Sequence, residues 1–210
     1  MLQIKETLAA GLVILSKWEP EIPLIDPFCG SGTIPIEAAL IGLNIAPGIN
    51  RNFAAENWPQ IPKKLWEKCR MEAKEKINLS KKLDIAGYDA DAEAIKIAQS
   101  NALKAMVGNQ ISFEQRSLNQ LSSKKKYGKI ICNPPYGERL GSKKEVEKLY
   151  KEMGRFFKKL DTWSYYILTS HRNFEKLFGR KATKKRKLYN GDIRVDYYQY
   201  YGPKPPKTAT

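Results

Sequence analysis

Short apolar runs alternate with longer amphipathic segments along most of this chain, and this alternation is the strongest constraint on its fold. Five runs predict strands: "PLIDPF", "LDIAGYDAD", "ISFEQRSL", "KIICNPP" and "WSYYILTS". The segments before, between and after them predict helices over residues 4–17, 33–48, 63–80, 91–108 and 143–159. Strands that alternate with helices are joined by crossover connections and pair in parallel. The sequence therefore predicts an α/β domain built on a parallel sheet.

The C-terminal part of the chain follows a different pattern. The stretch "KKRKLYNGDIRVDYYQYYG" holds two alternating runs around Asn190-Gly191, and Asn-Gly is typical of a type I′ hairpin turn. An antiparallel pair should therefore follow the five parallel strands, which makes a mostly parallel, seven-stranded sheet. We expect one domain over residues 1–203 and a flexible tail over residues 204–210.

The net charge restricts the partners that the protein can have. The 210 residues carry 37 Lys and Arg against 22 Asp and Glu, a formal charge of +15. This surplus favours a polyanionic partner such as nucleic acid, although solubility or a basic host proteome would also account for it. The three cysteines are widely spaced and there is one histidine, so we expect no zinc site, no disulfide framework and a cytoplasmic location. No apolar run approaches the roughly 20 residues of a membrane span.

A glycine loop follows the first predicted strand. In "DPFCGSGT", Gly30 and Gly32 have no Cβ, so a ligand can approach the backbone closely. Their N–H groups and the N-terminus of the next helix would suit a carboxylate or a phosphate. The loop has neither a GxGxxG pattern nor a Gly-Lys-Ser/Thr, which disfavours a P-loop nucleotidase. An ordinary tight turn is the alternative.

The second predicted strand ends in an acidic residue, Asp89. A carboxylate beside the glycine loop can accept both ribose hydroxyls of a bound nucleoside. Asp89 follows Gly32 by 57 residues, whereas a dinucleotide-binding fold has this acid about 20 residues on. An insertion over residues 49–80 accounts for the difference. Asp91 can cap the next helix or contact the ligand, and the sequence does not decide between the two.

The fourth predicted strand ends in "NPPY". Proline has no N–H and cannot donate within a sheet, so this strand must stop at Asn133. Ligands of open α/β sheets bind at the carboxyl ends of the strands. The side-chain oxygen of Asn133 and the carbonyl of Pro134 can accept hydrogen bonds from an amine, in a loop that Pro135 stiffens further. Tyr136 can stack on a base that has left its helical stack. A stiff turn without a functional role is the alternative.

Together, the glycine loop, the acid and "NPPY" resemble a class I S-adenosylmethionine-dependent methyltransferase of the kind that methylates amino groups. This resemblance implies a Rossmann-like fold and S-adenosyl-L-methionine as the cofactor. It also implies a catalytic site formed by Asn133, Pro134, Pro135 and Tyr136. No strong general base is required, because catalysis of this kind depends on positioning and electrostatics.

The flanking sequences narrow the resemblance. "KETLAA", "LIDPFCGSGTIPIEAALIGLNIAPGINR", "ICNPPYGERLG" and "KLYNGDIR" are similar to bacterial 23S rRNA guanine-N2 methyltransferases, which are often labelled N6-adenine DNA methylases. The resemblance implies transfer to the 2-amino group of a guanine. It implies that the cofactor is bound by Asp26, Cys29, Gly30, Gly32, Thr33, Asp89, Ala90, Ser117, Leu118 and Asn133. Many class I enzymes have an acid after the third strand to hold the adenine amine, and Ser117 or the backbone near Leu118 would replace it here.

Proteins of this family usually carry an N-terminal RNA-binding THUMP region, whereas this sequence begins almost at the catalytic domain. We therefore expect two partners, 23S rRNA and a missing THUMP-type domain. A non-catalytic RNA-binding fragment, active only with that domain, is one alternative to an RNA methyltransferase. A DNA adenine-N6 methyltransferase and a protein glutamine methyltransferase are two others.

Two basic runs, "SSKKKYGK" and "GRKATKKRK", could contact phosphates or form solvated loops. We expect RNA contacts from one residue after "NPPY" and from six in the second run: Arg139, Arg180, Lys181, Lys184, Lys185, Arg186 and Lys187. His171 follows the fifth strand, and we expect it to be a hydrogen-bonded loop residue and not a catalytic one.

Overall fold

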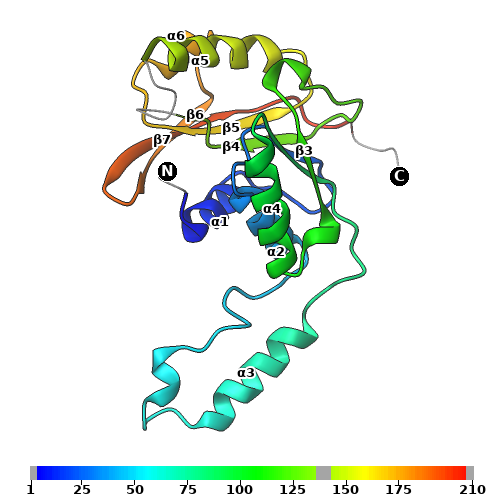
Figure 1. Cartoon of the computed structure of the whole chain (residues 1–210), viewed down its shortest axis with the longest axis vertical. Helices are drawn as coiled ribbons and strands as arrows, with labels where there is room; N and C mark the ends of the chain where they lie inside the picture. Colours follow the sequence, from blue (N-terminus) through cyan, green and yellow to red (C-terminus); the bar gives the residue numbers. More distant parts are fainter. Residues whose placement is uncertain (1–3, 136–142, 207–210) are drawn as a thin grey trace.

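The computed structural model describes residues 4–135 and 143–206. Within these ranges, one sheet holds seven strands in the order β3-β2-β1-β4-β5-β7-β6 (Figure 1). Their bounds are β1 Leu24–Asp26, β2 Ile85–Asp89, β3 Ile111–Gln115, β4 Lys129–Cys132, β5 Ser164–Thr169, β6 Lys184–Asn190 and β7 Ile193–Tyr200. The first five strands pair in parallel, whereas β7 is antiparallel to both β5 and β6. The predicted fold class, a mostly parallel seven-stranded sheet with a C-terminal antiparallel hairpin, is confirmed.

β1 lies in the middle of the sheet, where the strand order changes direction. Leu24 of β1 pairs with Ile85 of β2 on one side and with Lys129 of β4 on the other. At such a switch point the connections leave toward opposite faces, and a crevice opens at the carboxyl ends of the strands. The predicted glycine loop, the acid and the "NPP" segment follow β1, β2 and β4, so they meet at this one edge.

Helices cover both faces of the sheet. Their bounds are α1 Glu6–Leu15, α2 Thr33–Gly42, α3 Lys63–Glu75, α4 Ala92–Lys104, α5 Lys143–Phe157 and α6 Phe174–Phe178, with short 3₁₀ turns at η1 Ala54–Asn57, η2 Gly108–Gln110 and η3 Leu118–Gln120. α1, α2 and α4 lie on one face, and α5 and α6 lie on the other (Figure 1). All five predicted helices are present and are shorter than predicted, whereas the five-residue α6 was not predicted.

Neighbouring residues of β4 and β5 point to opposite faces of the sheet. Ile130 belongs to the hydrophobic cluster beneath α5, whereas Ile131 belongs to the cluster beneath α1 and α2. Tyr165 and Tyr166 of β5 are divided between the two clusters in the same way. This period of two, apolar on both faces, is expected for a parallel strand that helices cover on both sides. The core therefore fixes β4 directly before Asn133.

The insertion predicted over residues 49–80, which we call the arm, lies between α2 and β2. It carries η1 and α3 and extends away from the sheet (Figure 1). No residue of α3 is buried. Because α2 ends and β2 begins at the amino-end edge of the sheet, the arm leaves from the edge opposite the carboxyl ends. The long separation between Gly32 and Asp89 is explained by this insertion.

The hairpin turn lies one residue later than predicted. Asn190 pairs with Ile193, so Gly191 and Asp192 form the loop. Gly191 has a φ of +62°, whereas Asp192 is not in the left-handed region. A positive φ at the first loop residue alone is typical of a type II′ turn, so the predicted type I′ turn centred on Asn190-Gly191 is wrong.

Among the residues that the structure describes, no helix is long and apolar enough to cross a membrane. The same residues include no group of three or more His, Cys, Asp and Glu side chains that could hold a metal ion. The predicted boundary between a domain over 1–203 and a tail over 204–210 stays a prediction, since residues 207–210 lie outside the described ranges.

Candidate cofactor and amine site

The glycine loop joins the end of β1 to the start of α2. Gly30 and Gly32 both have positive φ, of +52° and +83°. A Cβ on Gly32 would lie 3.0 Å from the Cβ of Ala98 and from the ring of Phe113, so a larger residue would be both strained and crowded there. A Cβ on Gly30 would meet nothing within 4 Å. The loop is therefore packed tightly at Gly32 and leaves open space beside Gly30, where a ligand can approach.

Asp89 holds the glycine loop from the end of β2. Its Oδ2 accepts a hydrogen bond from the N–H of Gly30 at 2.9 Å, and its Oδ1 accepts one from the N–H of Asp91 at 3.1 Å. A carboxylate has about four acceptor positions, so two remain for the hydroxyls of a ligand. The carboxylate of Asp91 accepts from the N–H of Glu93 at 2.9 Å and caps α4. The cap, one of the two alternatives for Asp91, is thus present, and the ribose contact assigned to Asp89 stays a prediction.

Asp26, the last residue of β1, is buried. Its Oδ1 accepts a hydrogen bond from the N–H of Phe28 at 3.0 Å. Burial raises the pKa of Asp26 well above its usual range; the hydrogen bond from Phe28 opposes the rise and the charge of Asp89 adds to it. Burial also raises the pKa of the Cys29 and Cys132 thiols, and the charge of Asp26 adds to both shifts. These two thiols are therefore protonated at neutral pH and are poor nucleophiles.

Two further hydrogen bonds tie this edge together. The side-chain amide of Asn101 in α4 donates to the carbonyl of Ser31 at 3.0 Å, and that of Gln115 in β3 donates to the carbonyl of Ala90 at 3.0 Å. Thr33 begins α2, with its hydroxyl 3.3 Å from that of Ser31. The predicted residues Thr33 and Ala90 thus lie within the loop network. Asn101 and Gln115 were not predicted, because no local pattern marks a hydrogen bond to a loop so distant in the sequence.

Ser117 and Leu118 lie just after β3. The hydroxyl of Ser117 donates to Oδ1 of Asn119 at 2.6 Å, and the N–H of Ser117 donates to Oε1 of Gln120 at 3.0 Å. The hydroxyl oxygen can still accept a hydrogen bond, as contact with an adenine amine would require. Leu118 begins η3, with its side chain packed against the cluster beneath α5. Both predicted adenine contacts stay predictions.

Asn133 lies at the carboxyl end of β4, the strand next to β1. Its side chain is buried, and its Oδ1 has no hydrogen-bond partner among the described residues. An unpaired buried acceptor costs about 1–3 kcal/mol and needs an explanation, and ligand binding is one such explanation. Pro134 is buried and Pro135 is half-buried. Tyr136 and Arg139 lie outside the described residues, and the roles assigned to them stay predictions.

The predicted nucleic-acid contacts of the second basic run are all exposed: Arg180, Lys181, Lys184, Lys185, Arg186 and Lys187. The register of the sheet separates them. Through β7, Lys187 lies level with Thr169 at the end of β5, and Arg186 lies one residue before it. Lys184 and Lys185 lie level with the middle of β5, and residues 180 and 181 precede β6 at the amino-end edge. Only the last two residues of the run therefore lie level with the carboxyl ends.

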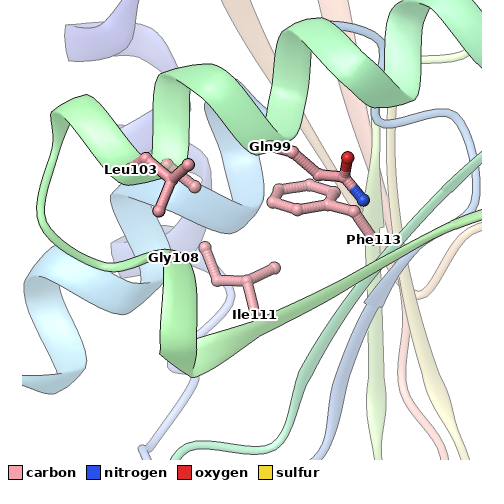
Figure 2. Close-up of a pocket in the computed structure, with 6 residues that line it drawn as sticks. Gln99, Leu103, Gly108, Ile111 and Phe113 are labelled. Carbon is pink, nitrogen blue, oxygen red and sulfur yellow. The ribbon is translucent and has the colours of Figure 1, made fainter.

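A pocket of about 300 Å³ lies elsewhere, between α4 and the edge strand β3 (Figure 2). Leu103, Ile111 and Phe113 line it, and of its six lining residues only Gln99 has a polar side chain. Ile111 begins β3 at the amino-end edge of the sheet. The pocket is apolar and none of the predicted site residues lines it, so we do not assign it to the candidate site; its closest link to that site is Phe113, whose ring also packs against Gly32.

The strand order, the glycine loop and the residues after β2 and β4 together define a class I methyltransferase domain. Residues 2–199 match the family model described as "RMKL-like, methyltransferase domain", and the chain belongs to this family. The predicted family resemblance is thereby confirmed.

Two curated relatives extend this comparison. YpsC from Bacillus subtilis (strain 168), provisionally named an RNA methyltransferase, is 56% identical over 97% of this chain and 53% of that protein. A "Ribosomal RNA large subunit methyltransferase K/L" from Legionella pneumophila (strain Philadelphia 1) is 40% identical over 93% of this chain and 28% of that protein. The chain therefore spans about half, or less, of the length of these relatives.

Two solved structures have nearly the same fold. SMU.472, crystallised with SAH, has a TM-score of 0.93 and 48% identity, over 98% of this chain and 54% of that one. A "predicted N6-adenine-specific DNA methylase" from Listeria monocytogenes has a TM-score of 0.90 and 51% identity, over 97% and 52%. The predicted cofactor, S-adenosyl-L-methionine, is confirmed as the cofactor of this methyltransferase family. The open space beside Gly30 and the free acceptor positions of Asp89 fit a nucleoside of this kind, although the assignment of single residues to it stays a prediction.

Proposed function

We propose that this domain transfers a methyl group from S-adenosyl-L-methionine to the exocyclic N2 amine of a guanine in 23S rRNA. The observation that carries the proposal is the buried, unpaired Oδ1 of Asn133, at the carboxyl end of β4 and beside the switch point of the sheet.

The chemistry of an exocyclic amine explains why an unpaired acceptor is useful here. The nitrogen lone pair of such an amine is delocalised into the base, so the amine is a weak nucleophile. Asn133 Oδ1 and the carbonyl of Pro134 would each accept one N–H of the amine, which orients the lone pair and stabilises the positive charge that develops on nitrogen. The methylated nitrogen then loses its extra proton to solvent.

The described part of the site has little that would serve another mechanism. Burial keeps the thiols of Cys29 and Cys132 protonated, which disfavours attack by a cysteine on a ring carbon. An amine needs no such covalent step. The cofactor supplies the electrophilic methyl group, while Asp89 and the glycine loop would bind its ribose and its amino-acid part through the acceptor and donor groups described above.

Three observations support RNA as the substrate. The formal charge of +15 suits a polyanion. Both curated relatives have names that specify RNA or ribosomal RNA methyl transfer. Arg186 and Lys187 are exposed and lie level with the carboxyl end of β5, where they could contact phosphates beside the target base.

A DNA adenine-N6 methyltransferase is the second candidate. The same acceptor pair would hold the 6-amino group of adenine, and the name of the Listeria structure specifies this activity. The two substrates are separated by experiment.

The protein would be incubated with radiolabelled S-adenosyl-L-methionine and either unmodified 23S rRNA or unmethylated genomic DNA, and the labelled nucleoside would be identified by mass spectrometry. N2-methylguanosine from rRNA is the expected result. N6-methyladenine from DNA would overturn it in favour of the second candidate. Absence of label from both, with cofactor binding intact, would refute the proposal that this domain alone carries the activity.

A further inference from the structure

The side chain of Tyr150, a residue of α5, contacts the "NPP" segment that follows β4. Its side chain is fully buried. Its hydroxyl lies 3.3 Å from the carbonyl of Pro135 and 2.8 Å from the hydroxyl of Thr169, the last residue of β5. The Thr169 hydroxyl also accepts a hydrogen bond from the N–H of His171 at 3.1 Å. The "NPP" segment, α5 and the end of β5 are thus connected through two buried hydroxyl groups.

Either hydroxyl can donate in the contact between Tyr150 and Thr169, and the contact with Pro135 favours one of the two arrangements. The carbonyl of Pro135 can only accept, so the single hydrogen of the Tyr150 hydroxyl points to it. The Thr169 hydroxyl must then donate to the oxygen of Tyr150, and it accepts from the N–H of His171. In this arrangement the three bonds named here run in the same direction toward Pro135, so that each polarises the next.

Tyr150 contacts the carbonyl of Pro135, whose direction depends on a backbone angle that the proline ring leaves free. Each proline ring fixes φ near −65°, so the direction of the Pro135 carbonyl depends on ψ alone. A hydroxyl that holds this carbonyl therefore fixes ψ of Pro135. It also occupies one of the two lone pairs of the Pro135 carbonyl, whereas Asn133 Oδ1 has no partner among the described residues and is the freer acceptor for an amine.

We infer that Tyr150 and Thr169 are positioning residues for methyl transfer, which hold the "NPP" segment in the geometry that accepts an amine. This inference rests on the proposed function, since it assigns these residues to the same site. Neither residue touches the substrate. His171 takes part through its backbone N–H, as a loop residue, and its ring stands edge-on to Tyr150 with centroids 5.5 Å apart.

Tyr165 offers a matched control within the same hydrophobic cluster. Like Tyr150 it is buried, and its hydroxyl shares its one hydrogen between the backbone carbonyls of Phe157 and Leu160, both at 2.7 Å. These carbonyls lie at the end of α5, away from the "NPP" segment. Tyr165→Phe therefore removes a buried hydroxyl of the same kind without touching the site.

The experiment compares Tyr150→Phe with Tyr165→Phe in the full chain, by Tm, by the Kd for S-adenosyl-L-methionine, and by kcat and KM on whichever nucleic acid the wild-type protein methylates. We expect the Tm of both variants to fall by a similar amount, and their Kd for the cofactor to stay within about twofold of the wild-type value. Because a small misplacement of reacting groups costs one to two orders of magnitude in rate, Tyr150→Phe should lower kcat by about tenfold, with KM unchanged. Equal kcat in the two variants would overturn the inference.

Thr169 gives a second test with its own rescue. Thr169→Val removes the hydroxyl and keeps the shape, and should lower kcat as Tyr150→Phe does. Thr169→Ser keeps the hydroxyl and should restore kcat. The double variant of Thr169→Val and Tyr150→Phe should be no slower than the slower single variant, because both changes break one network. Additive losses, or no rescue by serine, would contradict a shared role.

Hydrogen exchange separates a failure of this inference from a failure of the proposed function. If the wild-type protein methylates no nucleic acid, the proposed function fails. The amides of residues 129–133 should nevertheless exchange faster in Tyr150→Phe than in Tyr165→Phe if Tyr150 holds the segment that follows β4. Equal exchange in the two variants would show that it does not.

Discussion

The carboxyl-end edge of the sheet and the arm are held in place by different kinds of contact. At the edge, the N–H of Gly30 is bound by the carboxylate of Asp89, and the carbonyl of Ser31 is bound by Asn101 of α4. The partners in these bonds are 59 and 70 residues apart. In the arm, no residue of α3 is buried, and the hydrogen bonds of Arg70 join residues 14 to 21 positions apart.

The arm is organised around one guanidinium group. Arg70 of α3 donates to the carbonyls of Ile49 and Arg51 at 3.0 and 2.8 Å and to the carboxylate of Glu56 at 2.5 Å. The ring of Phe53 stacks on Trp66 with centroids 5.8 Å apart. All of these residues lie within the arm. Two further bonds, from Asn44 to the carbonyl of Lys76 and from the N–H of Asn78 to the carbonyl of Leu43, attach the arm to the end of α2. The site edge is therefore held by contacts between elements far apart in the sequence, and the interior of the arm mainly by contacts within the insertion.

The largest effect should follow from the loss of the unpaired oxygen of Asn133. Asn133→Ala removes an acceptor for the substrate amine, and we expect methyl transfer to fall by roughly 10²–10³-fold. Cofactor binding should persist, as measured by calorimetry with S-adenosyl-L-methionine. Asn78→Ala, at an exposed position in the arm, is the matched control and should leave transfer unchanged. Wild-type turnover in Asn133→Ala would remove the residue from the catalytic site.

The two ends of β2 provide the next contrast. Asp89 at the carboxyl end binds the N–H of Gly30, whereas Asp84, just before β2, forms an exposed ion pair with Lys125 at 2.6 Å. Asp89→Ala should raise the Kd for the cofactor by about tenfold or more, since it removes both the ribose acceptor and the support of the glycine loop. Asp84→Ala should leave the Kd unchanged, because exposed pairs contribute only about 0–1 kcal/mol. An equal Kd for the two variants would mean that Asp89 neither binds the cofactor nor shapes its loop.

Much of the carboxyl-end edge could be predicted from local sequence. Each strand stops where its residues can no longer donate or pack, as at Asn133 before two prolines, and the positive φ of Gly32 needs a glycine. These signals lie within a few residues of the feature that they predict. Where strands alternate with helices, the topology then brings Gly30, Asp89 and Asn133 to one edge without further information.

Other features depended on register and packing and could not be predicted. The pairing of Asn190 with Ile193 shifted the turn by one residue, and the same register divided the basic run between the two edges of the sheet. The contact from Tyr150 to Pro135 depends on how α5 packs across β5, and no periodicity in α5 distinguishes Tyr150 from an ordinary core residue. Long-range hydrogen bonds are set by tertiary structure, so the sequence marks the elements that meet but not the atoms.

A smaller effect should appear in the pH dependence of stability. Burial, with the charge of Glu6 adding to it, raises the pKa of Glu37 in α2 to about 7. The folded state therefore favours the protonated form of Glu37. Protonation of Glu37 stabilises the folded state fully below the usual pKa of a glutamate, and this contribution is lost as the pH rises toward 7. Glu37→Gln keeps the group neutral and should raise Tm by a few degrees at pH 8 while changing it little at pH 4.5.

The control for this measurement lies in the arm. Glu72 is exposed and faces Lys68 at 3.8 Å. Glu72→Gln should change Tm by less than about 1 °C at either pH, as expected for a surface pair. If the two variants shifted Tm equally at pH 8, the difference between the packed domain and the arm would not extend to electrostatics.

The smallest effect on activity should follow from breaking the arm itself. Arg70→Ala removes the three hydrogen bonds that connect α3 to residues 49–56, so the arm should be cleaved faster in limited proteolysis, by about tenfold. Lys68→Ala, on the same helix but only in the exposed pair with Glu72, should be cleaved at the wild-type rate. Because the arm leaves from the edge opposite Asn133 and Asp89, kcat and the Kd for the cofactor should stay within about twofold of wild type in both variants. A large loss of methyl transfer in Arg70→Ala alone would mean that the arm takes part in binding the nucleic acid. The arm and the carboxyl-end edge would then differ in how they are held in place, but both would serve the methyl transfer.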